Sequence, residues 1–164
     1  MSIVSAELKS AYLANLDMFR LSIVNCPDEF WDKVFGDNSP FWKEAYHCIF
    51  WMHTFIGDSS KQFSFTPFGK DIDPRLFVPA SNPCSKQEML EYIKVTADLV
   101  NSTFAQLTDQ EVTAVDRFTE PGEQTYHRNV LHRLLYGLRH GQHHTGKLTG
   151  YLLSNKVDYD PWRD

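Results

Sequence analysis

Apolar residues recur at steps of three and four through most of this chain, which places them on one face of an α-helix and so constrains the fold more than any other feature. The first such segment runs from Ser5 to about Asn25. Its predicted buried face consists of Leu8, Tyr12, Leu16, Phe19 and Ile23. No stretch alternates apolar and polar residues for long enough to predict a strand. The sequence therefore predicts an all-α fold.

A second helix is predicted after a dense break at residues 36–40, which combine glycine, asparagine, serine and proline. We expect Ser39 to be its N-cap and Pro40 its first helical residue. The helical pattern continues to Gly57, a residue type that is common where helices end. Before the break, residues 28–35 predict a short helical turn.

Residues 58–84 contain four prolines and one glycine and show no helical periodicity, so they predict a long connection. Short loops in a bundle make neighbouring helices antiparallel, whereas a long crossover lets two successive helices run parallel. The sequence therefore predicts a four-helix bundle in up-down-down-up order, with a long crossover between the second and third helices.

Two further helices complete the predicted bundle, and we expect residues 1–164 to form one domain. The third opens with Ser85 and Glu88 in an S-x-x-E capping box and runs to about Leu107. Its predicted buried face is Leu90, Ile93, Ala97, Val100 and Phe104. Residues 108–122 predict a loop, and the fourth helix is expected from about Thr125 to Asn155.

Charge and hydropathy exclude several classes of partner. The net charge is -5, and acidic and basic residues are mixed along the chain, so we expect neither nucleic acid nor anionic membrane as a partner. No apolar run approaches the roughly 20 residues that span a bilayer. The first residues lack a basic stretch followed by an apolar one, so we expect a cytoplasmic protein.

Three of the seven histidines lie within five residues of the predicted fourth helix. His140 and His144 are four apart, so they lie within about 40° of each other on one face. His143 lies about 60° to the other side of His140, which makes it a substitute ligand at most. The spacing H-x-x-x-H is common in half of a zinc site, but histidines that cap, stack or face solvent share it. The three cysteines are widely spaced, so a metal site would depend on imidazole.

A third ligand would have to come from another helix. His127 is too many turns away along the helix, and His132 lies on a divergent face. His47 and His53 in the second helix are six apart, about 120° around it, so at most one of them faces the site. The spacing alone leaves the choice between them open.

The segments PFWKEAYHCIFWMHTFI (40–56) and LLYGLRHGQHHTGKLTGYLL (134–153) resemble the two signature regions of the DinB-like superfamily of four-helix-bundle proteins, which includes YfiT-type metal-dependent hydrolases. The resemblance implies that His47, His140 and His144 together hold a divalent metal ion. It also implies a hydrolase or a low-molecular-weight-thiol S-transferase acting on a small-molecule substrate, and a homodimer. Imidazole ligands favour zinc, with nickel, iron or manganese as alternatives. Lys147 stands where the family often has glutamine.

Three further residues are candidates for a role in catalysis. Tyr136 and Lys147 share the face of the histidine pair, where they could orient an anionic or carbonyl group. A packed tyrosine and a solvated lysine are the alternatives. Glu44, one turn before His47, could face the same cavity, although a solvated acid at the start of a helix explains it as well.

Two classes of function stay open at this point. The first is a metal-dependent enzyme with three histidine ligands and an open coordination position. The second is a non-catalytic, stress-related bundle that binds a partner and keeps the histidines as polar packing or around a structural metal. The number of protein ligands around the ion separates the two.

Overall fold

The computed structural model describes residues 2–36, 39–57, 68–79, 81–116, 118 and 128–163. Within these residues the chain forms six helices and one two-stranded antiparallel sheet, and it is predominantly helical, which confirms the all-α prediction. The elements are α1 (Ile3–Asn25), α2 (Asp28–Trp31), β1 (Val34–Phe35), β2 (Ser39–Pro40), α3 (Phe41–Ile56), α4 (Lys86–Gln106), α5 (Asp109–Thr113) and α6 (Val130–Ser154).

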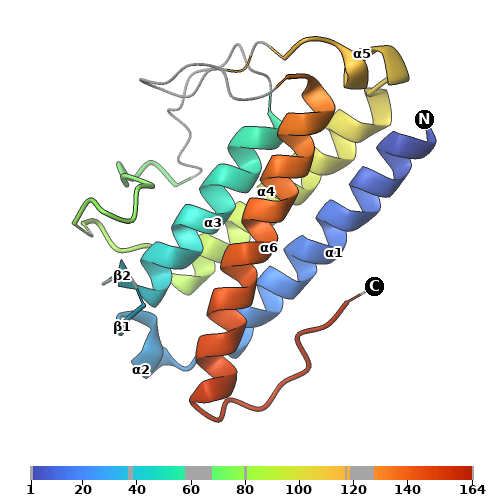
Figure 1. Ribbon diagram of the computed structural model, residues 1–164. Helices are drawn as coiled ribbons and strands as arrows, with labels where there is room; N and C mark the ends of the chain where they lie inside the picture. The colour runs from blue at the N-terminus through green and yellow to red at the C-terminus, as the bar shows by residue number, and fades with distance from the viewer. Residues whose placement is uncertain are drawn as a thin grey trace.

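The four long helices lie alongside one another (Figure 1). Each packs against two others: α3 lies against α6 and α4, and α1 lies against the same two helices from the opposite side. The N-terminal ends of α1 and α6 lie at one end of the molecule, and those of α3 and α4 lie at the other. None of the helices in the described ranges combines the length and hydropathy of a membrane span.

The start of α3 differs from the prediction. Pro40 is the N-cap, and Ser39 belongs to β2, where it pairs with Phe35 of β1. The extended pairing keeps Ser39 out of the helix, and its hydroxyl donates instead to the carbonyl of Leu76, 3.2 Å away. Two-residue strands of this kind have no alternation that a sequence pattern could reveal, which is why none was expected.

Helix boundaries elsewhere follow side-chain caps. The Ser85–Glu88 capping box is present as predicted. The expectation of a loop from residue 108 onward was wrong for α5, which begins with a second capping box between Thr108 and Glu111. This T-x-x-E pattern is the same signal as the one at Ser85. The predicted start of the fourth helix near Thr125 lies outside the described residues, and the described helix α6 begins after its N-cap Asn129.

The core lies between the four long helices. The whole predicted face of α1 is buried. In α4 the prediction was right for Ile93, Val100 and Phe104, but the face is rotated toward Met89 and Thr96. Leu90 and Ala97, which the prediction placed on the buried face, are only partly buried. The rotation turns α4 so that Thr96 faces α3.

A seam of small residues lets α6 approach its neighbours closely. An added Cβ at Gly137 would lie 2.7 Å from the Cβ of Phe55, and one at Gly141 would lie 2.1 Å from the sulfur of Met52. Both distances are below van der Waals contact. A side chain at 137 would meet Cβ of Phe55, which cannot move without its backbone, whereas one at 141 would require the side chains of Met52 and Asn15 to shift. This close approach holds α6 against α3 at the height of the histidine pair.

Candidate metal centre

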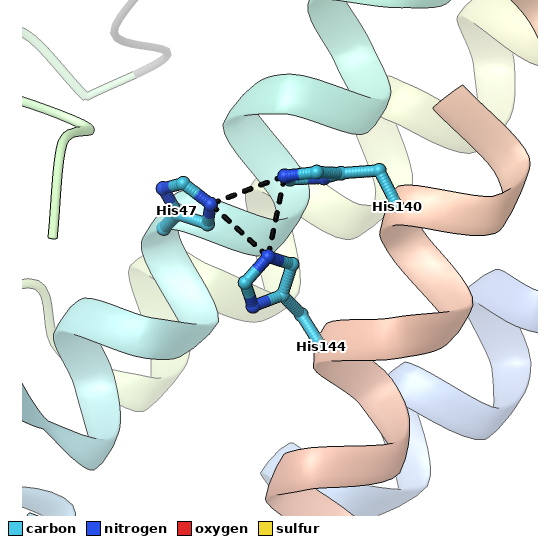
Figure 2. Close-up of side chains that lie close together, drawn as sticks. All are labelled: His47, His140 and His144. Carbon is cyan, nitrogen blue, oxygen red and sulfur yellow. Dashed lines mark hydrogen bonds between the residues drawn. The ribbon is translucent and has the colours of Figure 1, made fainter. Parts of the chain in front are cut away.

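The structure brings together three histidine side chains from two helices. His47 comes from the middle of α3, and His140 and His144 come from successive turns of α6. Their Nε2 atoms converge (Figure 2). The separations are 3.2 Å between His47 and His140, 3.1 Å between His47 and His144, and 3.2 Å between His140 and His144.

These separations fit a metal ion. Zinc binds imidazole nitrogen at about 2.0–2.1 Å in tetrahedral geometry, which sets neighbouring ligand nitrogens roughly 3.3 Å apart. The triangle of Nε2 atoms is within about 0.2 Å of that size. One ion above the triangle would therefore reach all three nitrogens with little movement of either helix.

The second ring nitrogen of His47 contacts the crossover segment between α3 and α4. Its Nδ1 lies 2.7 Å from the carbonyl oxygen of Pro74. A carbonyl oxygen only accepts, so Nδ1 carries the proton and donates, and Nε2 of the neutral ring is a bare lone pair. Burial, followed by repulsion from His144, lowers the pKa of His47 to about 4, so this ring is neutral at pH 7.

His144 is oriented by a carboxylate. Its Nδ1 donates to Oε1 of Glu44 across 2.5 Å, and Lys147 Nζ lies 2.8 Å from the same oxygen. Burial alone would raise the pKa of Glu44, but the hydrogen bonds from His144 and Lys147 outweigh it and lower this pKa to about 2. The carboxylate is therefore ionised and accepts the Nδ1 proton of His144, which leaves Nε2 of that ring directed at the other two histidines.

The Nε2 atoms of His47 and His144 consequently face each other across 3.1 Å. The outer partners, Pro74 and Glu44, hold the Nδ1 proton of each ring on its far side. An Nε2 proton on His140 can satisfy one of the two Nε2 atoms at a time. A cation between the three nitrogens satisfies all of them at once, which is the arrangement found around imidazole-bound metals.

His140 is held by packing. Its Nδ1 is buried and has no hydrogen-bond partner among the described residues. The ring stacks on Tyr136, with 6.2 Å between centroids, and meets the edges of Trp51 and Phe55. Burial, followed by repulsion from His144, lowers the pKa of His140 to about 3, so this ligand is also neutral at pH 7.

The other histidines lie elsewhere. His53 faces α4, where its Nδ1 lies 3.3 Å from the hydroxyl of Thr96. His143 is exposed, with its ring against the edge of His144. His132 is exposed in the first turn of α6, and His127 lies outside the described residues. The structure thus resolves the choice left open by spacing, since His47 and not His53 faces the pair on α6.

The cysteines lie apart from the three rings. Cys48 is buried in the core, and its sulfur lies 3.6 Å from the carbonyl of Gly141. Burial raises the pKa of Cys84 to about 12, so this thiol is not a ready nucleophile. Neither cysteine belongs to the histidine cluster.

Two parts of the centre, the Pro74 carbonyl and Lys43, were not visible in the sequence, whereas Glu44 was among its candidates. Glu44 is not the solvated acid that a helix start suggests, since it is 1% exposed and bonded to His144. Its place three residues before His47 indicated that the two side chains share a face of the helix. The Pro74 carbonyl offered no signal, because every residue has a backbone carbonyl and the sequence does not show which one accepts a hydrogen bond from His47. Nor did Lys43, which is 1% exposed and bonds to the neighbouring carbonyl of Asp73.

Comparison with known proteins gives one match. The model of a family described as the DinB superfamily matches residues 11–148, which include all three histidines and four long helices for most of their length. No curated protein and no solved structure matches the chain.

Proposed function

The chain belongs to the DinB superfamily, and we propose that it holds one divalent metal ion on His47, His140 and His144 and uses that ion as an enzyme. The reaction class is hydrolysis of a small molecule or transfer to or from the sulfur of a low-molecular-weight thiol. When bound, the ion supplies Lewis acidity that lowers the pKa of a water or thiol toward neutrality.

One observation carries the metal assignment. The Nε2 atoms of His47 and His144 face each other across 3.1 Å, and the Nδ1 protons of these rings are donated to Pro74 and Glu44 on their far sides. With both Nδ1 atoms engaged in this way, the Nε2 atoms are the nitrogens left to bind a cation. His47 and His140 are neutral at pH 7, so neither of these ligands has to lose a proton when the ion binds.

An enzymatic role is supported by the number and setting of the ligands. The described residues supply three histidines, the number that catalytic zinc sites use, whereas structural sites use four protein ligands. His47 and His140 are partly exposed, so the cluster borders solvent. We propose zinc as the ion on ligand type, with nickel, iron or manganese as alternatives.

The flanking residues take different roles in this proposal. Oε1 of Glu44 is engaged by His144 and Lys147, so Glu44 acts as a positioning residue that holds the ligand. Tyr136 positions His140 by stacking. Lys147 is the candidate to meet an anionic or carbonyl group of the substrate, because its side chain is 24% exposed beside the cluster.

We also propose that the four long helices form the four-helix bundle expected of the family, in up-down-down-up order. The shared direction of α3 and α4 in Figure 1 supports it. A homodimer in the cytoplasm is proposed on the family resemblance.

Metal binding is tested on protein stripped with a chelator and then titrated separately with Zn²⁺, Ni²⁺, Fe²⁺ and Mn²⁺ under anaerobic conditions. We expect one equivalent to bind to the wild type and none to the triple variant H47A/H140A/H144A. H53A is the matched control, because it removes a histidine of α3 that faces α4 and not the cluster, and it should bind as the wild type does. Equal binding by the wild type and the triple variant would overturn the assignment.

The open position is tested with Co²⁺ in place of the native ion. Absorption bands that shift when a small thiol or azide is added indicate an exchangeable position and support an enzyme. Bands of a four-coordinate site that do not respond to either additive would instead indicate a structural metal.

A further inference from the structure

Residues 71–78 lie along the N-terminal half of α3 (Figure 1). They are attached there by side chains from β2 and α3. Three such side chains hold successive points of this segment. Ser39 donates to the carbonyl of Leu76, Lys43 donates to the carbonyl of Asp73, and His47 donates to the carbonyl of Pro74. The outer partner of a proposed metal ligand therefore belongs to an irregular segment, whose position has to be set by other contacts.

Lys43 is the unusual member of this set. Its side chain is fully buried, with 1% exposed, and the partner of its ammonium group among the described residues is the Asp73 carbonyl. Burial lowers the pKa of Lys43, which shows that the environment disfavours the charge. A buried ammonium is costly, and a methionine of similar length would fill the same space without that cost. Packing therefore does not explain a lysine here, whereas the hydrogen bond to Asp73 does.

Lys43 and His47 stand one helical turn apart on α3, so their side chains lie one above the other on the same face. They bond to the carbonyls of two consecutive residues, Asp73 and Pro74. The Asp73 carbonyl belongs to the planar peptide unit that ends at Pro74, and the proline ring fixes φ of Pro74. Holding the first carbonyl therefore leaves mainly the ψ angle of Pro74 to set where the second lies. The ammonium group thereby acts on the histidine ring through the segment that they share.

We propose that Lys43 is a positioning residue of the metal centre: by holding the Asp73 carbonyl, it keeps the Pro74 carbonyl against Nδ1 of His47 and so keeps the Nε2 lone pair of that ring directed at the ion. This inference rests on the proposed function, because a positioning residue matters only if the centre binds a metal ion. The effect of Lys43 on the tautomer of His47 is nevertheless expected in metal-free protein as well. When the Pro74 carbonyl moves away, the proton of His47 can transfer to Nε2, where it occupies the ligand lone pair.

The test reads the tautomer of His47 in metal-free protein labelled with ¹⁵N-histidine, by long-range ¹H–¹⁵N NMR at pH 7. In the wild type we expect the proton on Nδ1. In K43M, which matches the length of lysine but has no donor, the form with the proton on Nε2 becomes a substantial fraction. Zinc affinity should fall by about 10- to 100-fold, the range for loss of an outer-shell partner. K43R keeps a donor and should restore both readouts.

S39A is the matched control, because it removes a different hydrogen bond to the same segment, at Leu76, and leaves Asp73 and Pro74 alone. It should keep the wild-type tautomer. The proposal is overturned if folded K43M shows the wild-type tautomer, or if S39A changes the tautomer as much as K43M does. If K43M does not fold, K43L replaces it, since leucine also has no hydrogen-bond donor, and the same two outcomes apply.

Different results would overturn the proposed metal-dependent function and the positioning role of Lys43. A wild type that binds no metal but shows the predicted change of tautomer in K43M removes the function and leaves the positioning role. A wild type that binds zinc on the three histidines while K43M has an unchanged tautomer removes only the positioning role.

Discussion

His144 on α6 donates through Nδ1 to Oε1 of Glu44 on α3 across 2.5 Å, so one buried carboxylate connects the two helices that carry the three histidines. The bond decides which nitrogen of His144 is free to bind a cation. It also places a negative charge behind the ligand, which raises the basicity of the ring toward a metal.

Replacing Glu44 with glutamine should weaken metal binding by about 10- to 100-fold, because a neutral amide supports the His144 ring less well than a carboxylate. Isothermal titration of chelator-stripped protein with Zn²⁺ measures the change. K147M is the matched comparison, since it removes the second donor to Glu44 but leaves the bond to His144. A loss in K147M that equals or exceeds the loss in E44Q would contradict the role assigned to the carboxylate.

Among the three ligands, His140 should contribute least to affinity. When its Nε2 binds an ion, its proton must sit on Nδ1, which is buried without a described partner. An unpaired buried N–H costs about 1–3 kcal/mol, which reduces the gain from this ligand. H140A should therefore retain tighter Zn²⁺ binding than H47A or H144A. The ranking is wrong if H140A proves the weakest binder of the three.

Substitutions at the glycines of α6 should separate close packing from helix propensity. G137A places a methyl group 2.7 Å from Cβ of Phe55, which cannot move without its backbone, so we expect a loss of about 1–3 kcal/mol in the free energy of unfolding. Metal affinity should fall too, as α6 moves away from α3. G146A, whose added Cβ meets nothing within 4 Å, is the control and should be neutral or stabilising by up to about 1 kcal/mol. Urea denaturation measures both, and equal effects would refute the packing argument.

The stability of the metal-free protein should depend on pH through His53. Burial lowers the pKa of His53 from 6.5 to about 4. Below pH 6.5 the unfolded chain takes up a proton at this position while the native protein does not, so the free energy of unfolding falls as the pH falls. The loss from this residue is complete below about pH 4 and amounts to at most about 3 kcal/mol.

H53Q removes this ionisable group and should show a shallower fall in the free energy of unfolding between pH 7 and pH 4. His47 and His140 stay in both proteins, so the difference between the two curves isolates His53. Denaturant titrations at a series of pH values give the curves. Parallel curves would mean that His53 is protonated in the native protein and that its burial has been misjudged.

Local patterns in the sequence were sufficient to predict where the long helices lie along the chain. The spacing of Leu8, Tyr12 and Leu16 identified the buried face of α1, and the Ser85 capping box located the start of α4. Both signals act within a few residues of chain, where the backbone geometry of a helix determines which side chains are neighbours. The face of α4 was displaced by one position, because its rotation depends on what α3 presents to it.

The candidate ligands were recognisable on α6 for the same reason. Four-residue spacing puts His140 and His144 on one face wherever the helix lies. The third histidine was different, since His47 and His53 satisfied the spacing equally and only the family resemblance favoured His47. Their environments now differ: His47 meets His140 and His144, and His53 meets Thr96.

The sequence by itself determined that this chain is helical, where most of its helices begin and end, and that two histidines share a face, because all of these depend on interactions between residues a few positions apart. Only the tertiary structure decided what surrounds those histidines. The partners of His47 and His144 are Pro74, 27 residues away, and Glu44, 100 residues away. Contacts over such separations depend on how α3, α6 and the crossover pack, and the directions of the lone pairs follow from that packing.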